Sequence, residues 1–158
     1  ARLLFEHVAA ARANQPGLRV KCRCSFVQIY KEQVYDLLGG AFNLGAVNSG
    51  KPSSSFAPTH VNARALGSGL KMRYNQGDGF YLENLRFVEC ADTEDVLACF
   101  QEGVKHKVMA SHRMNMASSR SHAMFQIHLT IGRSGASEDA SEDVARSRLT
   151  LVDLAGSE

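Results

Sequence analysis

Two stretches of this chain combine residue types that can bind phosphate and metal ions. The first, LTLVDLAGSE over Leu149–Glu158, is an apolar run that ends in Asp153 and is followed three positions later by Gly156. Nucleotide-binding α/β proteins use such a strand to place a carboxylate at its C-terminal end beside Mg²⁺, and glycine lets the backbone approach a phosphate closely. Taken alone, the DxxG tetrad is explained better by a buried strand that ends in an ordinary turn.

The second stretch, NMASSRSH over Asn115–His122, offers three hydroxyls, one amide and one guanidinium ahead of a strand-like run. Hydroxyls of such a loop can bind a metal or a phosphate, and the guanidinium can pair with a nearby carboxylate. The simpler alternative is a polar turn with a serine-rich cap. We therefore consider the two stretches as a pair.

As a pair, NxxSSRSH and LVDLAGSE resemble the switch I and switch II signatures of the kinesin motor superfamily, in the same order and at a plausible separation. Myosins have a similar SSR loop but lack a histidine at the position of His122 and do not read DLAGSE. The segment Phe26–Leu38 also resembles a kinesin segment, with Gln28 where glutamate is usual. Met116 and Ala117 differ from the residues that many kinesins have at these positions. Neither position holds an indispensable group, so the difference does not exclude hydrolysis and concerns only its rate.

The resemblance implies both a fold class and an activity. The fold would be α/β, a three-layer P-loop NTPase-type mixed sheet flanked by helices, of which this chain would be the central part. The protein would be a microtubule-stimulated ATPase that uses ATP and Mg²⁺, binds tubulin and works in the cytoplasm on the microtubule cytoskeleton. Two alternatives are a kinesin-like module that binds microtubules or proteins without turnover, and a small regulatory GTPase, which shares only the DxxG tetrad.

The resemblance also implies a role for individual residues. Hydrolysis of a γ-phosphate mainly requires positioning and charge stabilisation. Ser119 would coordinate Mg²⁺, Asp153 would reach the ion through a water, and Ser118 would hold the attacking water. Asn115 would contact the phosphate region, and the backbone N–H of Gly156 would bond the γ-phosphate.

The remaining polar side chains of the two stretches are either assigned a role by the resemblance or explained equally well by local structure. By resemblance, an ion pair between Arg120 and Glu158 would latch the two loops together. Ser121 is as easily a turn hydroxyl as a functional one. His122 is more simply a packed, hydrogen-bonded histidine than a catalyst.

A phosphate cradle is the part that the sequence does not supply. Gly45–Pro52 nearly matches the loop GxxxxGK[ST], but Pro52 replaces the hydroxyl residue, and neither a strand before it nor a helix after it is evident. We therefore expect the phosphate loop to precede Ala1 and the main filament-binding helix to follow Glu158. On this interpretation, residues 1–158 are a fragment of a longer protein, and the isolated fragment is inactive.

Composition limits the partners. The net charge of +2 is too small to argue for nucleic acid, and no apolar run of about 18 residues predicts a membrane span. Lys71 and Arg73 are candidates for tubulin contact, because kinesins use this region for it, although exposed basic side chains are as easily just solvated. The oligomeric state is not predicted.

The cysteines and histidines predict no metal site. Cys22 and Cys24 form a CxC pair, which is weak evidence for zinc without a second pair nearby. We expect these two, with Cys90 and Cys99, to be reduced and packed thiols of a cytosolic protein. The spacing of the histidines suggests no ligand set.

A sheet must position the two stretches, and alternation predicts its strands. Ala123–Ile131 alternates well. Val20–Tyr30 also reads as a strand, and one of its faces is polar at the start and apolar later, which suits a strand entering a sheet covered on both sides. The other predictions are a helix over residues 1–13, short strands over Leu70–Tyr74 and Phe80–Val88, a flexible surface insertion over residues 39–69, and an acidic surface loop over residues 132–148 that joins antiparallel neighbours.

One long helix precedes the switch-like loop. It begins at Thr93, where acidic residues suit a helix N-terminus and a later pair of lysines suits the C-terminus. The apolar spacing predicts a buried stripe formed by Val96, Leu97, Phe100 and Val104.

Overall fold

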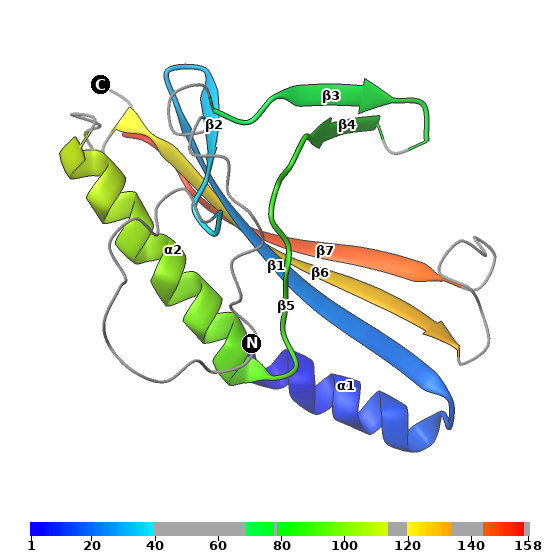
Figure 1. Cartoon of the computed structure of the whole chain (residues 1–158). Coiled ribbons are helices and arrows are strands. Elements are labelled where there is room, and N and C mark those ends of the chain that lie inside the picture. Colours follow the sequence, from blue (N-terminus) through cyan, green and yellow to red (C-terminus); the bar gives the residue numbers. More distant parts are fainter. Residues whose placement is uncertain (40–68, 78, 114–119, 134–143, 157–158) are drawn as a thin grey trace.

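A computed structural model describes residues 1–39, 69–77, 79–113, 120–133 and 144–156. Almost all of the predicted insertion, including the phosphate-loop look-alike Gly45–Pro52, lies outside the described residues, as does most of the predicted acidic loop. The described part contains two helices, a five-stranded sheet and a separate two-stranded hairpin (Figure 1).

The main sheet has the order β2-β1-β6-β7, with β5 paired to β1, and all of these pairings are antiparallel. The hairpin of β3 and β4 lies apart from it (Figure 1). The elements are α1 Arg2–Asn14, β1 Leu18–Tyr30, β2 Gln33–Asp36, β3 Met72–Asn75, β4 Gly79–Leu82, β5 Val88–Glu89, α2 Thr93–Arg113, β6 His122–Arg133 and β7 Ala145–Asp153.

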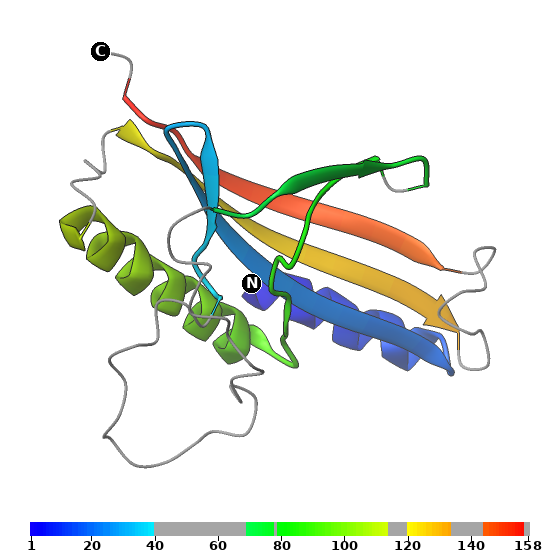
Figure 2. The same cartoon turned by 45° about the horizontal axis from the view of Figure 1, so that its top comes forward.

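Both helices pack on one face of the sheet (Figure 2). Alternate residues of β1 face them, so Cys22, Cys24 and Phe26 are buried beneath the helices. The Phe26 ring stacks on Phe100 of α2, with centroids 5.8 Å apart, and meets Phe125 of β6 edge-on at 5.3 Å. The described residues therefore form two layers, helices over sheet, around an apolar core.

The middle of β1 is buried on both faces, which agrees with the predicted strand that enters a sheet covered on both sides. Every residue from Cys24 to Gln28 is buried, including the polar Ser25 and Gln28. β6 alternates as predicted, with Ala123, Phe125 and Ile127 buried on the core face.

The predicted buried stripe of α2 is wrong at three of its four positions. Val96 is buried, but Leu97, Phe100 and Val104 are 48%, 40% and 37% exposed. The face that meets the sheet instead runs through Val96, Cys99, Gly103 and His106. Gly103 explains the rotation, because a Cβ at this position would lie 2.1 Å from the Phe26 ring. The helix approaches the sheet closely where it has no side chain.

Two strand boundaries also differ from the prediction. The single strand expected over Phe80–Val88 is interrupted by a turn at Asn84, whose φ of 63° is a conformation that asparagine tolerates. β7 begins at Ala145, four residues before the expected start of the apolar run at Leu149. Its antiparallel pairing with β6 confirms the predicted neighbours.

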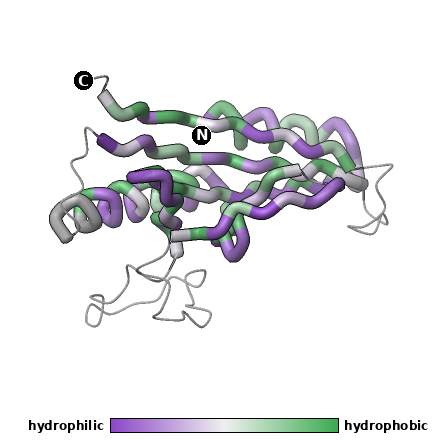
Figure 3. The backbone as a smooth tube through the Cα atoms, turned by 90° about the horizontal axis from the view of Figure 1, so that it is seen from above, coloured by the Kyte–Doolittle hydropathy of each residue, from purple (hydrophilic) through white to green (hydrophobic). Residues whose placement is uncertain are grey.

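β7 is the last strand of the sheet order, and its apolar residues are exposed. Leu149, Leu151 and Val152 each have more than half of their surface accessible. Figure 3 shows this hydrophobic stretch leading to the C-terminal end of the chain. The strand that the DxxG tetrad suggested is therefore present, but in the described residues it is an exposed edge.

Candidate active site

The two chemistry-bearing stretches meet at one end of the sheet. β6 starts where β7 ends, and the register places Ala123 opposite Asp153. The C-terminal end of α2 reaches the same end of the sheet (Figure 1). Antiparallel pairing thus brings together motifs that are about thirty residues apart in sequence.

A hydrogen bond joins the two stretches directly. The backbone N–H of Ala155 donates to Nδ1 of His122 at 3.0 Å. His122 is half-buried, and as the acceptor its Nδ1 carries no proton, so a neutral ring has its hydrogen on Nε2. This is the packed, hydrogen-bonded histidine that the sequence favoured, and it holds the start of β6 to the residues after β7.

Asp153 projects from the end of β7 and pairs with a lysine of α2. Lys107 Nζ lies 2.6 Å from Asp153 Oδ2, and the Asp153 side chain is 73% exposed. The hydrogen bond and charge of Lys107 lower the pKa of Asp153. Asp153 is therefore an ionised, accessible carboxylate at a strand end. The sequence assigned Lys107 only to the helix C-terminus and missed this contact.

A hydrogen bond from β1 holds the Ser121 side chain in place. Gln28 Nε2 donates to Ser121 Oγ at 2.8 Å, and both side chains are fully buried. Within the described residues, the other amide atom of this side chain, Gln28 Oε1, has no hydrogen-bond partner. The sequence noted Gln28 as a departure from the kinesin pattern but gave no sign that it reaches the switch-like loop.

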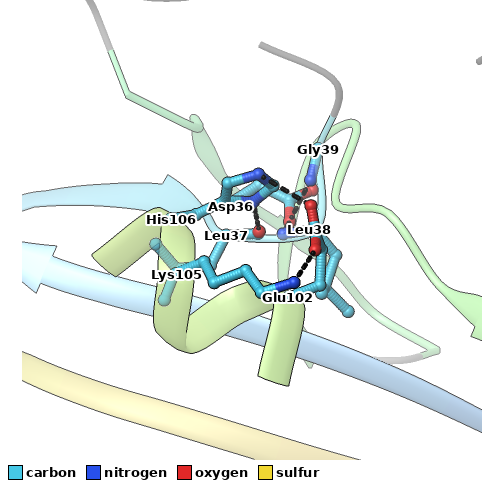
Figure 4. Close-up of polar contacts among 7 residues, drawn as sticks. All are labelled: Asp36, Leu37, Leu38, Gly39, Glu102, Lys105 and His106. Atoms are coloured by element: carbon cyan, nitrogen blue, oxygen red, sulfur yellow. Dashed lines mark hydrogen bonds and ion pairs between the residues drawn. The ribbon is translucent and has the colours of Figure 1, made fainter. Parts of the chain in front are cut away.

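A hydrogen bond to the segment that follows β2 anchors the C-terminal half of α2, which leads into the switch-like loop, and Asp36 orders that segment (Figure 4). His106 Nδ1–H donates to the Leu37 carbonyl at 2.5 Å, because a carbonyl can only accept, and His106 Nε2 lies 3.2 Å from Glu102 Oε1. Asp36 Oδ1 accepts from the backbone N–H groups of Leu38 and Gly39, both at 2.9 Å. Asp36 Oδ2 accepts from the Arg86 N–H at 2.8 Å. Burial raises the pKa of Asp36 although these bonds oppose it.

The remaining predicted site residues are only partly covered by the structure. Gly156 and Arg120 are exposed on either side of the junction between the motifs. The structure therefore brings Asp153, Gly156 and Arg120 to one end of the sheet. The predicted site residues outside the described ranges are Asn115, Ser118, Ser119 and Glu158.

The two basic candidates for tubulin contact lie at the β3–β4 hairpin. Lys71 is exposed just before β3. Arg73 Nε and Nη2 each lie 3.2 Å from Glu83 Oε2, so Arg73 forms an exposed ion pair within the hairpin region.

Two searches of the described residues bear on metals and membranes. In those ranges, no group of three or more His, Cys, Asp or Glu side chains is arranged to hold a metal ion. Neither helix in the described part is long and apolar enough to cross a membrane.

Comparison with known families decides the identity of the fold. The model of the kinesin motor domain matches residues 1–158. The chain belongs to the kinesin motor domain family. The mouse (Mus musculus) kinesin-like protein KIF12 is 33% identical over 141 residues, which are 88% of this chain and 18% of that protein. The Arabidopsis thaliana kinesin-like protein KIN-12D is 32% identical over 157 residues, which are 98% of this chain and 5% of that protein.

Solved kinesin structures have the same fold. The structure of a fast kinesin matches 99% of this kinesin chain with a TM-score of 0.69 and 23% identity. The C-terminal motor domain of Kar3 from Candida glabrata matches 98% of it with a TM-score of 0.62 and 24% identity. The chain covers 36% and 38% of those two structures. These likenesses confirm the predicted fold class.

Proposed function

We propose that the protein containing this chain is an ATP-driven microtubule motor and that these residues supply its two nucleotide-sensing switches. The chain spans 18% or less of the length of the two kinesin-like relatives above. The proposal therefore concerns the full-length protein. A kinesin-like module that binds microtubules without turnover is the alternative.

The observation that carries the proposal is the junction of the two motifs at the hydrogen bond from Ala155 to His122. In a nucleotide switch, loops that contact the γ-phosphate and Mg²⁺ must move together when the phosphate leaves. A direct bond between the end of the first loop and the start of the second couples them in the way this requires. Asp153 and Gly156, which are both exposed, lie at the end of β7 beside this bond.

The residues at this end suit Mg²⁺ and ATP. Magnesium prefers oxygen ligands and keeps several waters, and the ionised carboxylate of Asp153 is an acceptor for a water on that ion. Ser119 would supply a hydroxyl ligand. Bound Mg²⁺ would neutralise charge on the phosphates. Ser118 would orient the attacking water, Asn115 would contact the phosphates, and Gly156 would donate its backbone N–H.

The β3–β4 hairpin is the proposed tubulin contact. Lys71 and Arg73 provide positive charge there, although the ion pair with Glu83 partly neutralises the charge of Arg73. The exposed aromatic rings of Tyr74 and Phe80 lie 5.1 Å apart beside them. A motor with this contact would be found in the cytoplasm, along microtubules.

Turnover by the full-length protein tests the proposal. Release of phosphate from Mg-ATP should rise when microtubules are added, and Ser119→Ala should abolish this rise by removing the magnesium hydroxyl ligand. Ser147→Ala is the matched control, because Ser147 is an exposed serine of β7 paired with Leu129, away from the motif end. Microtubule binding without any ATP turnover in the wild-type protein would favour the non-catalytic module.

A further inference from the structure

Four free cysteines gather in one place, away from the motif end of the sheet. Cys22 and Cys24 are on β1, Cys90 follows β5, and Cys99 is on α2. All four are buried members of one core cluster, and Cys24 and Cys99 are completely inaccessible. Chain segments that are far apart in sequence therefore converge on a patch of thiols.

Contacts between the thiols are direct. Cys90 Sγ lies 3.8 Å from Cys99 Sγ, which is van der Waals contact. The backbone also holds Cys90 in place, because its N–H donates to the Cys22 carbonyl at 2.9 Å, continuing the β1–β5 ladder. A disulfide needs a shorter sulfur separation with suitable side-chain torsions, and the nine-residue spacing from Cys90 to Cys99 leaves the first turns of α2 between them.

A cavity gives small molecules access to this patch. It has a volume of about 360 Å³ and lies between α1 and β1. Its walls include Phe5, Val8 and Val20 and, among the cysteines, Cys22 and Cys90. Cys90 thus faces the cavity on one side and Cys99 on the other.

We infer that Cys90 and Cys99 form a peroxide-oxidisable dithiol that closes to a disulfide and staples the start of α2 to the end of β5. The patch is reduced in the structure, with all four cysteines free. Within the described residues, no group of three or more His, Cys, Asp or Glu side chains is arranged to hold a metal ion. The inference does not depend on the proposed motor activity.

The chemistry balances with hydrogen peroxide as the oxidant. The Cys90 sulfur attacks one peroxide oxygen, the O–O bond breaks, and the leaving hydroxide takes the thiol proton as water, which leaves a sulfenic acid on Cys90. The Cys99 sulfur then attacks the Cys90 sulfur, the S–O bond breaks, and a second water leaves with the Cys99 proton. The two thiols lose two electrons and the peroxide gains them.

Cys99 is suited to the attacking role. Hydrogen bonds from the Cys24 and Cys90 thiols lower the pKa of Cys99, and the charge of Arg86 lowers it further, against the effect of burial. The pKa of Cys90 is raised, since a hydrogen bond to Cys24 lowers it but the hydrogen bond to Cys99 and burial raise it more. Cys90 therefore meets peroxide as a thiol, and Cys99 is the better thiolate nucleophile of the pair. Cys99 does not line the cavity, whereas Cys90 and Cys22 do, so an oxidant entering it meets these two thiols first.

Trypsin mapping of the full-length protein tests this inference. Cleavage after Lys and Arg leaves Cys90 and Cys99 together in the peptide Phe87–Lys105, while Cys22 and Cys24 fall in two other peptides. After treatment with hydrogen peroxide and blocking of free thiols, we expect Phe87–Lys105 to have lost two hydrogens and to resist the blocking reagent. A thiol reductant should restore both free thiols.

The wild-type result decides the matter without any variant. Unmodified Phe87–Lys105, oxidation confined to Cys22, or a cross-link from Cys22 to Cys90 would each overturn the inference. Cys99→Ser should abolish the loss of hydrogens, whereas Cys22→Ser, which leaves the pair intact, should retain it. Val8→Phe should slow the reaction, because Val8 lines the cavity through which peroxide enters.

Discussion

The buried amide of Gln28 links β1 to the residue at which the switch-like loop ends. Its Nε2 donates to Ser121 Oγ, and neither side chain has access to water that could replace the bond. A buried polar group that loses its partner carries an energetic cost larger than the net value of the bond itself. The pair therefore fixes where the loop leaves the sheet.

Gln28→Leu and Ser121→Ala should each destabilise the protein by about 1–2 kcal/mol, because each leaves the other side chain buried without this partner. The double variant should lose less than the sum, since the shared bond is counted once. Urea unfolding of the full-length protein, compared across the four forms, measures the coupling. Additive losses would mean that the hydrogen bond does not contribute to stability.

Gly156 follows β7 where the sensor N–H is proposed to meet the γ-phosphate. Gly156→Ala should leave ATP binding largely intact and suppress microtubule-stimulated hydrolysis, because a Cβ would obstruct closure of the loop. Nucleotide affinity and steady-state turnover of the full-length variant distinguish the two effects. Normal turnover would remove Gly156 from the mechanism.

At the scale of elements, α2 is positioned by a close approach to β1. Phe26 cannot yield to a new side chain at Gly103, because its ring is held between Phe100 and Phe125. Gly103→Ala should therefore destabilise the protein by about 1–2 kcal/mol, since overpacking outweighs the gain in helix propensity.

A propensity control separates the two contributions. Ala98 lies on the exposed face of the same helix. Ala98→Gly should therefore lower the free energy of unfolding by about 1 kcal/mol through helix propensity alone. Thermal unfolding of both variants gives the comparison. A stabilised Gly103→Ala protein would show that the helix can move away from Phe26.

The two switch loops are proposed to be latched by Arg120 and Glu158. Arg120→Glu and Glu158→Arg should each strongly reduce turnover, and the double swap should recover part of it because the charges are then complementary again. ATPase rates of the full-length variants measure the coupling. Equal rates for the double swap and the single variants would place Arg120 in another role.

The elements differ in how far the sequence could predict them. β6 was predictable because alternate residues such as Phe125 and Ile127 are apolar, and one face of that strand is the core. The buried face of α2 could not be predicted in this way, because the spacing of apolar residues does not mark Gly103. The absence of a side chain at Gly103 is what allows the helix to contact Phe26. The contacts of Lys107 and Gln28 also depend on tertiary placement, which no local pattern encodes.

At the scale of the molecule, the described sheet ends in an apolar edge. β7 is last in the sheet order and exposes Leu149, Leu151 and Val152. Exposed strands with unpaired backbone groups promote association. Produced by itself, the polypeptide of residues 1–158 should therefore aggregate, and addition of a small amount of detergent should reduce this.

The same polypeptide should not bind ATP with useful affinity. P-loop proteins bind the phosphates of a nucleotide through consecutive backbone N–H groups at a helix N-terminus and through a lysine that contacts the β- and γ-phosphates. The nearest match in the sequence, Gly45–Pro52, lacks the hydroxyl residue that follows the lysine. Switch residues such as Asp153 and Gly156 sense the γ-phosphate without holding the rest of the nucleotide.

Isothermal titration of soluble residues 1–158 with Mg-ATP measures this directly. We expect no heat of binding beyond dilution, and the full-length protein titrated under the same conditions is the positive control. Micromolar binding by residues 1–158 would contradict the prediction and show that they contain a phosphate cradle. A second titration of Lys51→Ala would then decide whether Gly45–Pro52 provides it, because loss of binding would identify Lys51 as the phosphate ligand.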